Sequence, residues 1–585
     1  MPRWVACQGP DPVAQLAAMG AHSIVSDAAD GSPITSLAAG TGGSGVRAGG
    51  PVDNVALGLL AGTGPAVGPF RVGSLTAVGE VTLFNAAELR RLTGAPADAT
   101  HAELLLHAYA RGEVAAADGM FVLAVSDGGS LVLVRDHVGA RTLFHATAGA
   151  HWAAATSLRA LRDWPALDTG LHLPAVTSFL TFAYLPGTDT FLRGVHEALP
   201  GRVTTRHGTR TFWEPREETD ERSPEAHADA LRALLEDATA RRLPDAEPAA
   251  VLLSGGVDSS LVTALAAKLH DHPVHTYSIS FGADLPNELG YSGLVAAHCR
   301  TEHTVLSVSG QTVADRLEGT VALLDSPVGD PLTVPNLLLA EAVAATGASA
   351  VLNGEGGDPV FGGPKNLPML IFELHRDDPD PDARARTYLE SYRKCHGDLP
   401  MLLTRATQEA LAGAPPLTDH VAPYLRPGPM RGLLNQLLHT NLRTKGAHHI
   451  LTKVERLTAA TGIEGRAPLF DRAVIDHAFR VPPRYKLNGT AEKWILKEAV
   501  RDLLPATIVD RPKSGMRVPV QQWLHGPLRD LGHDLLLGPT ARARGLFRPD
   551  TIETWLRREG TLLPRQGGKL WLLLTLELWL RSYGL

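Results

Sequence analysis

The chain is poor in the residues that mark several classes of protein. Its 585 residues include only three cysteines, Cys7, Cys299 and Cys395, whose spacing matches neither a disulfide framework nor a metal site. Basic residues do not outnumber acidic ones, and a formal net charge of -7 gives no electrostatic reason to expect a nucleic-acid partner. The composition therefore predicts a reduced, ordinary globular enzyme without nucleic acid.

Long apolar runs are also missing. The first residues, Met-Pro-Arg-Trp, contain no basic segment followed by an apolar core, so we expect no secretory signal. The most apolar tract, residues 570–580, is interrupted by Glu577 and is too short to cross a bilayer. We predict that it forms a buried terminal helix with Trp571 and Trp579 in its core. These features favour a cytoplasmic protein that has no membrane partner.

Two halves with different patterns follow one another along the chain. Residues 72–155 hold short apolar or alternating runs separated by turns such as Asp-Gly-Gly, with one helix at 103–111. A polar stretch at 214–225 then precedes a helix at 226–241. The predicted domains are therefore 1–214 and 222–585, with a flexible Ala/Gly-rich loop at 38–50.

The second half alternates strands and helices before it becomes mostly helical after Gly363. The predicted strands are at 251, 275–281, 304–308 and 348–352, with helices between them. Such alternation favours a parallel sheet that is covered on both faces, with its ligand at the carboxyl ends of the strands. The sequence therefore predicts an α/β fold for this half.

Residues 249–260, Ala-Ala-Val-Leu-Leu-Ser-Gly-Gly-Val-Asp-Ser-Ser, carry an apolar strand into a Gly-Gly turn and a helix. Gly255 and Gly256 let the backbone approach an anion, and N–H groups around Ser254, Ser259 and Ser260 can donate to phosphate oxygens. The helix that follows, at 261–269, adds its positive end. Because no Lys follows the glycines, the G-x-x-x-x-G-K-[ST] loop of ATPases is excluded.

Two further carboxylates fall where this architecture needs them. Residues 353–363, Asn-Gly-Glu-Gly-Gly-Asp-Pro-Val-Phe-Gly-Gly, follow the strand at 348–352. We predict that Asp358 and Asp258 bind Mg²⁺, since hard cations prefer carboxylate oxygen. Glu355 is predicted to lie near the reacting centre.

The first loop resembles the SGG-x-DS PP-loop of ATP pyrophosphatases, and both loops in this order resemble the asparagine synthetase B-like family. Residues 462–471, 493–497 and 509–515 are similar to later segments of that family, so the resemblance covers most of 230–525. It implies an AMP-forming, ATP-dependent amide ligase in which Lys513 stabilises charge on the reacting phosphates. The nucleotide contacts that it implies are Leu253, Ser254, Gly255, Gly256, Asp258, Ser259, Ser260, Ile279, Asn353 and Gly354.

The first half resembles the glutamine-hydrolysing domain of the same family at residues 79–85, 118–121 and 135–141. The resemblance implies an N-terminal degenerate Ntn-hydrolase (class II glutaminase-like) sandwich domain, followed by a PP-loop synthetase domain with a doubly wound parallel sheet. Glutaminase chemistry needs a cysteine directly after the initiator methionine, where this chain has Pro2, and Cys7 has no free α-amine. His101 also stands where the family has a substrate-holding Asp. We therefore expect no ammonia release from glutamine.

Within the family, the chain is most similar to the lasso peptide macrolactam synthetases, or lasso cyclases, at residues 135–146 and 329–336. That resemblance implies adenylation of an Asp or Glu side chain in a precursor peptide, and attack by the peptide's own N-terminal amine. The partners implied are the precursor core peptide, a leader peptidase and a leader-binding protein. An ammonia-dependent asparagine synthetase, a β-lactam synthetase-like enzyme and a non-enzymatic scaffold remain alternatives, although β-lactam synthetases carry Tyr where this chain has Glu355.

Two other patterns support weaker predictions. His448 and His449 lie in a helical stretch near Lys445 and Lys453, where they could face a substrate cavity, but without a third ligand they are expected to be structural rather than metal ligands. Ion pairs within 455–456 and 464–466 are possible, and a solvated helix face is an equal alternative.

Overall fold

The computed structural model describes residues 3–21, 23–27, 33–38, 54–60, 68–282, 288–363, 369–370, 382–391, 394–513, 515–558 and 567–585. The chain divides into two compact units, Met1–His172 with Gly187–Glu214, and Leu173–Pro186 with Pro215–Leu585. Residues Leu173–Pro186 cluster with the second unit, whereas the sequence analysis included them in the first predicted domain, 1–214. Its helix α5 (Leu173–Phe182) is buried, and the Leu180 carbonyl accepts a hydrogen bond from the Cys395 N–H at 3.0 Å. Most of the loop predicted at 38–50 lies outside the described residues.

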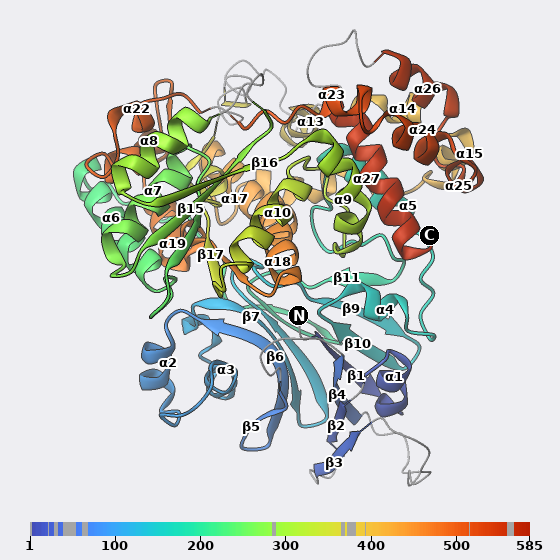
Figure 1. The fold of residues 1–585 in the computed structure, drawn as a ribbon. Helices are drawn as coiled ribbons and strands as arrows, with labels where there is room; N and C mark the ends of the chain where they lie inside the picture. Colours follow the sequence, from blue (N-terminus) through green and yellow to red (C-terminus); the bar gives the residue numbers. More distant parts are fainter. Residues whose placement is uncertain are drawn as a thin grey trace. The chain divides into compact units, whose positions relative to one another are not determined.

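The first unit is built from two antiparallel sheets (Figure 1). One has the order β11-β9-β10-β1-β4-β2-β3 and the other β13-β12-β8-β7-β6-β5. The strands are β1 (Arg3–Gly9), β2 (Ser23–Asp27), β3 (Pro33–Ala38), β4 (Asn54–Leu60), β5 (Phe70–Val72), β6 (Leu75–Leu83), β7 (Gly119–Asp127), β8 (Ser130–Arg135), β9 (Phe144–Ala148), β10 (His151–Ala155), β11 (Val195–Glu197), β12 (Arg202–Thr205) and β13 (Gly208–Thr211). The helices are α1 (Pro12–Ala18), α2 (Ala86–Thr93), α3 (His101–Ala110) and α4 (Leu158–Arg162).

A shared apolar core holds the two sheets face to face. Trp4 and Leu57 of one sheet pack in the same cluster as Val122 and Leu133 of the other. Helices α2 and α3 cover the outer face of the second sheet, and β7 is buried along almost its whole length because both of its faces are covered. This arrangement confirms the sandwich predicted for the first domain.

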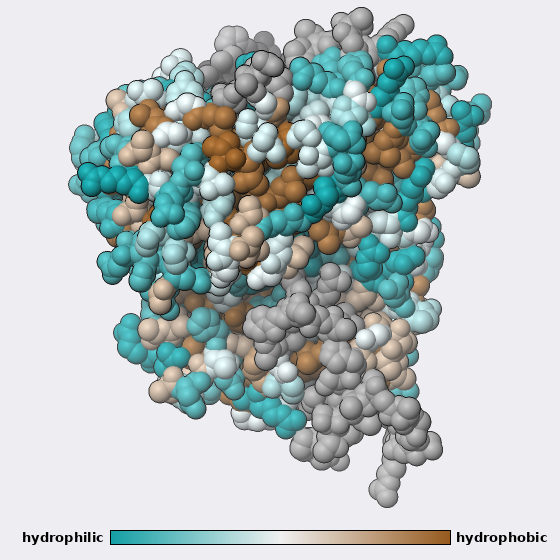
Figure 2. Space-filling view, viewed as in Figure 1, coloured by the Kyte–Doolittle hydropathy of each residue, from teal (hydrophilic) through white to brown (hydrophobic). Residues whose placement is uncertain are grey.

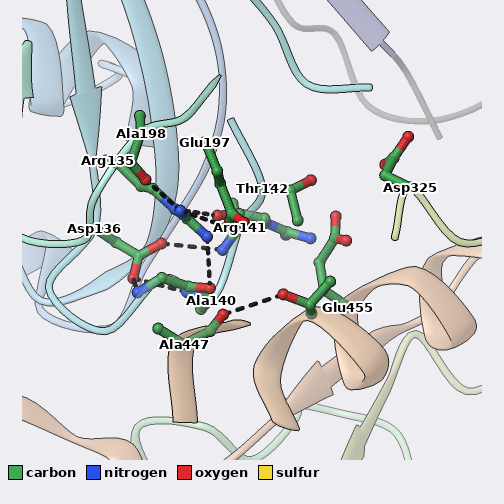
Figure 3. A network of polar contacts seen from close by, with 12 residues as sticks. Arg135, Asp136, Ala140, Arg141, Thr142, Glu197, Ala198, Asp325, Ala447 and Glu455 are labelled. Atoms are coloured by element: carbon green, nitrogen blue, oxygen red, sulfur yellow. Dashed lines mark hydrogen bonds and ion pairs between the residues drawn. The ribbon is translucent and has the colours of Figure 1, made fainter. Parts of the chain in front are cut away.

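A buried carboxylate organises the loop after β8 (Figure 3). Asp136 Oδ1 accepts hydrogen bonds from the N–H groups of Val138, Gly139 and Ala140 at 3.1, 2.7 and 2.9 Å. Burial raises the pKa of the Asp136 carboxyl, and these N–H groups act in the opposite direction. Arg135 Nε donates to the Arg141 carbonyl at 2.7 Å, so backbone contacts close the loop on itself. This segment is therefore held by its own hydrogen bonds.

The second unit is centred on five parallel strands in the order β16-β15-β14-β17-β18. They are β14 (Ala249–Leu252), β15 (Val274–Ser280), β16 (Glu302–Ser307), β17 (Ala350–Leu352) and β18 (Glu464–Arg466). Strands β14 and β17 are neighbours, with Val251 opposite Leu352, and the direction of winding reverses between them. Loops that follow these two strands consequently flank the ligand-binding switch point of a doubly wound sheet, as the sequence predicts.

Helices cover the sheet and extend the unit (Figure 1). Those around the sheet are α6 (Pro224–Ala240), α7 (Val257–Leu269), α8 (Leu289–Cys299), α9 (Gly310–Ala322), α10 (Thr333–Ala344), α11 (Gly357–Phe361), α17 (Leu433–Asn441), the π-helix η4 (Leu442–Ile450), α18 (Leu451–Ala460), α19 (Arg472–Arg480) and α21 (Trp494–Ala499). Others are α13 (Ala383–Ser391), α14 (Leu399–Leu402), α15 (Arg405–Ala410), α16 (Ala422–Leu425), α20 (Pro483–Lys486), α22 (Ala506–Val509), α23 (Val520–His525), α24 (Arg529–Leu537), α25 (Pro539–Arg544) and α26 (Pro549–Arg558). A short hairpin, β19 (Leu487–Asn488) and β20 (Ala491–Glu492), precedes α21.

The terminal helix α27 (Gly567–Tyr583) confirms the prediction for residues 570–580. Trp571 and Trp579 are fully buried, and Glu577 is paired with Arg544 and with Arg581, the latter at 2.7 Å. Among the described residues, no helix combines the length and the apolar character that crossing a membrane would need. Two predicted ion pairs are also formed, Arg456 with Glu455 at 3.2 Å and Arg466 with Glu464 at 3.0 Å.

The visible surface is mostly polar, with separate apolar areas (Figure 2). Large apolar side chains that are exposed are few in the described part of the chain, namely Leu92, Tyr291, Leu294, Val305, Leu323 and Met401. Single exposed apolar residues of this kind are normal for globular proteins.

Candidate active site

The loop between β14 and α7 depends on one glycine. Gly255 has a φ of +83°, and a Cβ atom there would lie 2.8 Å from both the Ser292 nitrogen and the Tyr291 Cβ. Only glycine fits this backbone and this packing. The helix α7 begins at Val257, earlier than the sequence indicates, so Asp258 lies in its first turn.

Hydroxyl groups brace this loop from inside. Ser254 N–H donates to Ser259 Oγ at 3.1 Å, and Ser259 Oγ donates to the Gly256 carbonyl at 3.2 Å. Ser260 is fully buried, and its N–H donates to the Gly256 carbonyl at 3.0 Å. The N–H groups of Ser254 and Ser260 donate within the protein, and the expectation that they contact phosphate stays a prediction. The prediction for Ser259, Gly255 and Gly256 stays a prediction.

The loop after β17 packs directly against the first one. A Cβ atom on Gly354 would lie 2.4 Å from the Ser259 nitrogen, and one on Gly357 would lie 2.2 Å from Asp258 Oδ1. Glycine at both positions therefore lets the two loops touch. The structure brings together the two loops that the sequence predicts to face each other.

Asn353 starts the second loop and is almost wholly buried. Its N–H donates to the Arg466 carbonyl at 3.0 Å, and its Oδ1 accepts from the Glu355 N–H at 3.0 Å. Asn353 therefore ties the loop to β18 and orients Glu355. This contact supports a role for Asn353 in shaping the site.

One lysine joins the two aspartates. Lys493 Nζ lies 2.5 Å from Asp258 Oδ2 and 2.5 Å from Asp358 Oδ1, so these oxygens are no farther apart than twice that distance. Lys513 Nζ lies 3.0 Å from the same Asp358 oxygen and 3.6 Å from Asp258 Oδ2. The predicted metal ligands and the predicted catalytic lysine thus share one cluster of charges.

The charges in this cluster shift one another's proton affinities. Burial alone would raise the pKa of Asp358, but Lys493 and then Lys513 hold it well below its usual range. For Lys513, burial acts to lower the pKa, and the Asp258 and Asp358 carboxylates outweigh burial and raise it. Asp358 is consequently ionised, and Lys513 is a cation, at neutral pH.

The two carboxylates suit Mg²⁺. Asp258 Oδ1 is buried and has no hydrogen-bond partner among the described residues, and this oxygen is available to a ligand. Mg²⁺ in phosphate-transfer sites is held by one or two carboxylates plus phosphate oxygens and water. Among the described residues, no group of three or more His, Cys, Asp and Glu forms a metal cage, so the phosphates of ATP would complete such a site. Asp258 and Asp358 remain the predicted ligands.

Glu355 leaves its carboxylate unused. Its side chain has no hydrogen bond or ion pair with the described residues, although its charge acts on both Lys513 and Lys453. A carboxylate that is oriented through its backbone and interacts electrostatically with two cations can accept a hydrogen bond from a substrate. The charge of Glu355 raises the pKa of Lys513, and the role of Glu355 near the reacting centre stays a prediction.

Two hollows flank the first loop. One is lined by Leu253, Ser254 and Ile279 together with Ser278, Phe281, Glu288, Leu289, Ser292, Met516 and Arg517. It places Leu253 and Ile279 on a mixed apolar and polar wall of the kind that receives a nucleoside. The other borders Gly256 and includes Lys493, Lys497 and Lys513. Three lysines beside the loop suit a departing pyrophosphate.

Two positioning residues were not predicted from the sequence as site members. Lys493 belongs to the segment 493–497, and its φ of +54° is an uncommon conformation for a residue other than glycine. Arg511 Nη1 donates to the Gly255 carbonyl at 3.0 Å, and its guanidinium stacks over Tyr291 at 3.8 Å. Both lie in segments that resemble the family, and this resemblance is the only sequence signal that points to a role in the site.

The comparisons with known proteins agree with this geometry. Residues 230–581 match the Asparagine synthase family, and residues 63–214 match the Glutamine amidotransferase domain family. A protein of Mycobacterium tuberculosis that carries the name of a glutamine-hydrolysing asparagine synthetase is 28% identical and covers 69% of this chain and 68% of its own. Asparagine synthetase 1 of Bacillus subtilis is 23% identical over 73% and 72%. The carboxyethyl-arginine beta-lactam-synthase of Streptomyces clavuligerus is 26% identical over 77% of both chains.

The fold and the site define an ATP-dependent, amide-forming ligase. The chain belongs to the asparagine synthase family, with an amidotransferase-like domain before the synthetase domain.

Proposed function

We propose that the protein closes a macrolactam ring in a lasso precursor peptide. ATP adenylates an Asp or Glu side chain of the core peptide, and the N-terminal amine of the same peptide displaces AMP. A leader peptidase and a leader-binding protein would prepare the peptide. The proposal places the source of nitrogen in the substrate itself rather than in glutamine.

The burial of Cys7 carries this proposal. It is the one cysteine of residues 1–214 and lies in the middle of β1, opposite Ala56 on one side and Ala153 on the other. Its side chain is fully buried, and burial raises the pKa of the thiol to about 12. A thiol that stays protonated within a sheet is not a glutaminase nucleophile.

The residues of the second unit supply the remaining chemistry. The loops at Gly255 and Gly354 hold the nucleotide, and Mg²⁺ on Asp258 and Asp358 would neutralise charge on the phosphates. Lys513 stabilises the charge that develops when pyrophosphate leaves. Glu355 accepts a hydrogen bond from the incoming amine. Because both reacting groups belong to one molecule, holding them together is worth up to about 7 to 11 kcal/mol in favourable cases.

A second candidate is favoured by one comparison. The relative from Streptomyces clavuligerus is named for β-lactam synthesis, which is also amide formation. Formation of a small ring would use the same ATP site and the same Glu355 environment. Ammonia-dependent asparagine synthesis is the third possibility, and free aspartate with ammonia tests it directly.

Mass spectrometry of reaction products separates these candidates. A leader-free precursor peptide incubated with enzyme and Mg-ATP is expected to lose one water in step with AMP formation. Lys513→Ala is expected to lower turnover by roughly two orders of magnitude or more, about 2.7 kcal/mol. Glu355→Gln should still form acyl-AMP while cyclisation fails. An enzyme that makes AMP only with aspartate and ammonia, and dehydrates no peptide, would contradict the proposal.

A further inference from the structure

A second polar cluster lies within electrostatic reach of Glu355. Lys453, on α18, is buried, and its Nζ lies 2.6 Å from Asp330 Oδ2. The other oxygen of Asp330 accepts from the Leu332 N–H at 3.0 Å, which fixes the carboxylate. Burial acts to lower the pKa of Lys453, but Asp330 and then Glu355 raise it. Lys453 is thus a fixed cation that uses one hydrogen-bond donor of three within the described residues.

His449 presents two unused ring nitrogens beside this ion pair. Its ring stacks on Tyr184 at 5.3 Å with an interplanar angle of 4°, and the Tyr184 hydroxyl donates to Thr444 Oγ1 at 3.1 Å. Both nitrogens of His449 are buried without a hydrogen-bond partner among the described residues. A buried polar atom without a hydrogen bond is unfavourable, and a ligand that bonds to it would remove that cost.

Burial, reinforced by nearby cations, keeps this imidazole neutral. Burial lowers the pKa of His449 well below its usual range, Asp330 opposes this shift, and Lys453, Lys445 and Lys394 reinforce it. A neutral imidazole has one donor and one acceptor nitrogen. His449 can therefore donate to a carbonyl and accept from an amine.

The helix that carries His449 also reaches the phosphate site. Residues Leu442–Ile450 form a π-helix, a rare conformation that is frequent at functional sites. Lys445 on the same π-helix contributes to the lowered pKa of Asp358. One element therefore connects the aspartate pair with the cluster of Asp330, Lys453 and His449.

The hydrogen-bonding groups that Glu355, His449 and Lys453 leave unused match the amine and carbonyl of a peptide N-terminus. Glu355 and one nitrogen of His449 are acceptors, and Lys453 and the other nitrogen of His449 are donors. The first residue of a peptide offers both an amine donor and a carbonyl acceptor. We propose that His449 and Lys453, backed by Asp330, form the subsite that binds the primary amine and the adjacent carbonyl of the substrate's nucleophilic end. This inference deepens the proposed function and relies on it for the identity of the nucleophile.

A fragment of that end tests the subsite directly. Glycinamide has the amine and the carbonyl, whereas N-acetylglycinamide lacks the basic amine and is the matched control. In the full-length protein with ¹⁵N-labelled histidine, glycinamide should shift the His449 resonance, identified by its loss in His449→Gln. Lys453→Met should weaken this effect at least about fivefold, and His533→Gln should leave it unchanged. No shift at saturating glycinamide, or an equal shift with N-acetylglycinamide, would overturn the proposal.

A second readout separates the subsite from adenylation. Hydroxylamine traps an acyl-AMP from solution and needs no amine-binding site. In His449→Gln, hydroxamate formation from the precursor peptide should persist while macrolactam formation falls at least about tenfold. Equal losses of both products would contradict the assignment. If the wild type dehydrates no peptide, the proposed function fails, and the glycinamide titration still decides the subsite.

Discussion

The ammonium group of Lys493 lies 2.5 Å from a carboxylate oxygen of Asp258, a residue 235 positions earlier in the chain. It makes an equally short contact with Asp358. Lys493 is thus the internal cation that holds the two glycine loops together. Its side chain is only 1% exposed, and these two carboxylates are its ion-pair partners.

Removing one carboxylate should stop the chemistry and leave the fold intact. Asp258→Asn and Asp358→Asn are each expected to abolish ATP–pyrophosphate exchange, because each leaves one carboxylate where Mg²⁺ and phosphate need two. Lys493 keeps one partner in either variant. The double variant leaves a buried lysine without a carboxylate, which should cost about 3 to 5 kcal/mol of stability. Exchange assays and thermal melts of the three variants check this, and undiminished exchange in both single variants would refute it.

The contact between the two loops should tolerate no side chain at Gly354. A methyl group there would meet the Ser259 backbone nitrogen at 2.4 Å, so Gly354→Ala should displace the loop, cost roughly 1 to 3 kcal/mol and lower exchange activity. The control is Gly293→Ala in helix α8, where nothing lies within 4 Å. That change should be neutral or stabilising by up to about 1 kcal/mol. Equal melting curves for the two variants would show that the loops do not touch.

The first unit should contribute no glutaminase activity. The purified protein is expected to release no glutamate from glutamine, and Cys7→Ala should leave amide formation unchanged. The native Cys7 thiol should also react with a thiol reagent only after unfolding, because it is fully buried and burial raises its pKa to about 12. Glutamate release that disappears with Cys7 would contradict this prediction.

A buried lysine should give the stability a distinct pH dependence. Lys486 is fully buried, and burial lowers its pKa to about 7, although Glu217 acts in the opposite direction. The unfolded chain keeps the ordinary value of 10.5, so between these two values the unfolded state binds more protons and stability rises with pH. The destabilisation is fully present below about pH 7. Lys486→Met should remove this rise, which denaturant titrations of both proteins from pH 6.5 to 9.5 would detect.

The same titrations carry their own control. Lys486 donates to Asn435 Oδ1 at 2.7 Å and lies 4.7 Å from the centre of the Phe479 ring. Losing these contacts shifts stability by a similar amount at every pH at which the lysine is charged. The slope of the free energy of unfolding against pH is therefore the informative quantity. Parallel curves for the two proteins would mean that Lys486 stays charged throughout.

The sequence predicts those parts of the site that depend on local chemistry. Apolar strands followed by glycines predict the turns at Gly255 and Gly354. The alternation of strands and helices predicts a parallel sheet, which brings Asp258 and Asp358 to one edge. Strand β18 was not predicted because Glu464, Gly465 and Arg466 show no apolar alternation. Glycine is needed at 465 because Val454 packs closely against it.

Long-range contacts account for what the sequence did not predict. The role of Lys493 depends on partners more than a hundred residues away, and local propensity disfavours its positive φ. The hydroxyl of Ser260 is directed into the protein because helix α7 begins four residues earlier than the pattern indicates. Helix α5 groups with the second unit through contacts such as Ser178 Oγ with His420 Nε2 at 3.0 Å. Such contacts are set by tertiary packing and leave no local pattern.

Oxygen transfer tests the central claim most directly, namely that this site activates a carboxylate as an acyl-AMP. A precursor peptide whose Asp or Glu side chain is labelled with ¹⁸O should pass one labelled oxygen to AMP during ring closure. Pyrophosphate should form in equal amount and carry no label. Free ¹⁸O-aspartate with ammonia provides the matched comparison for asparagine synthesis. Label recovered in inorganic phosphate, with ADP as the nucleotide product, would contradict the account.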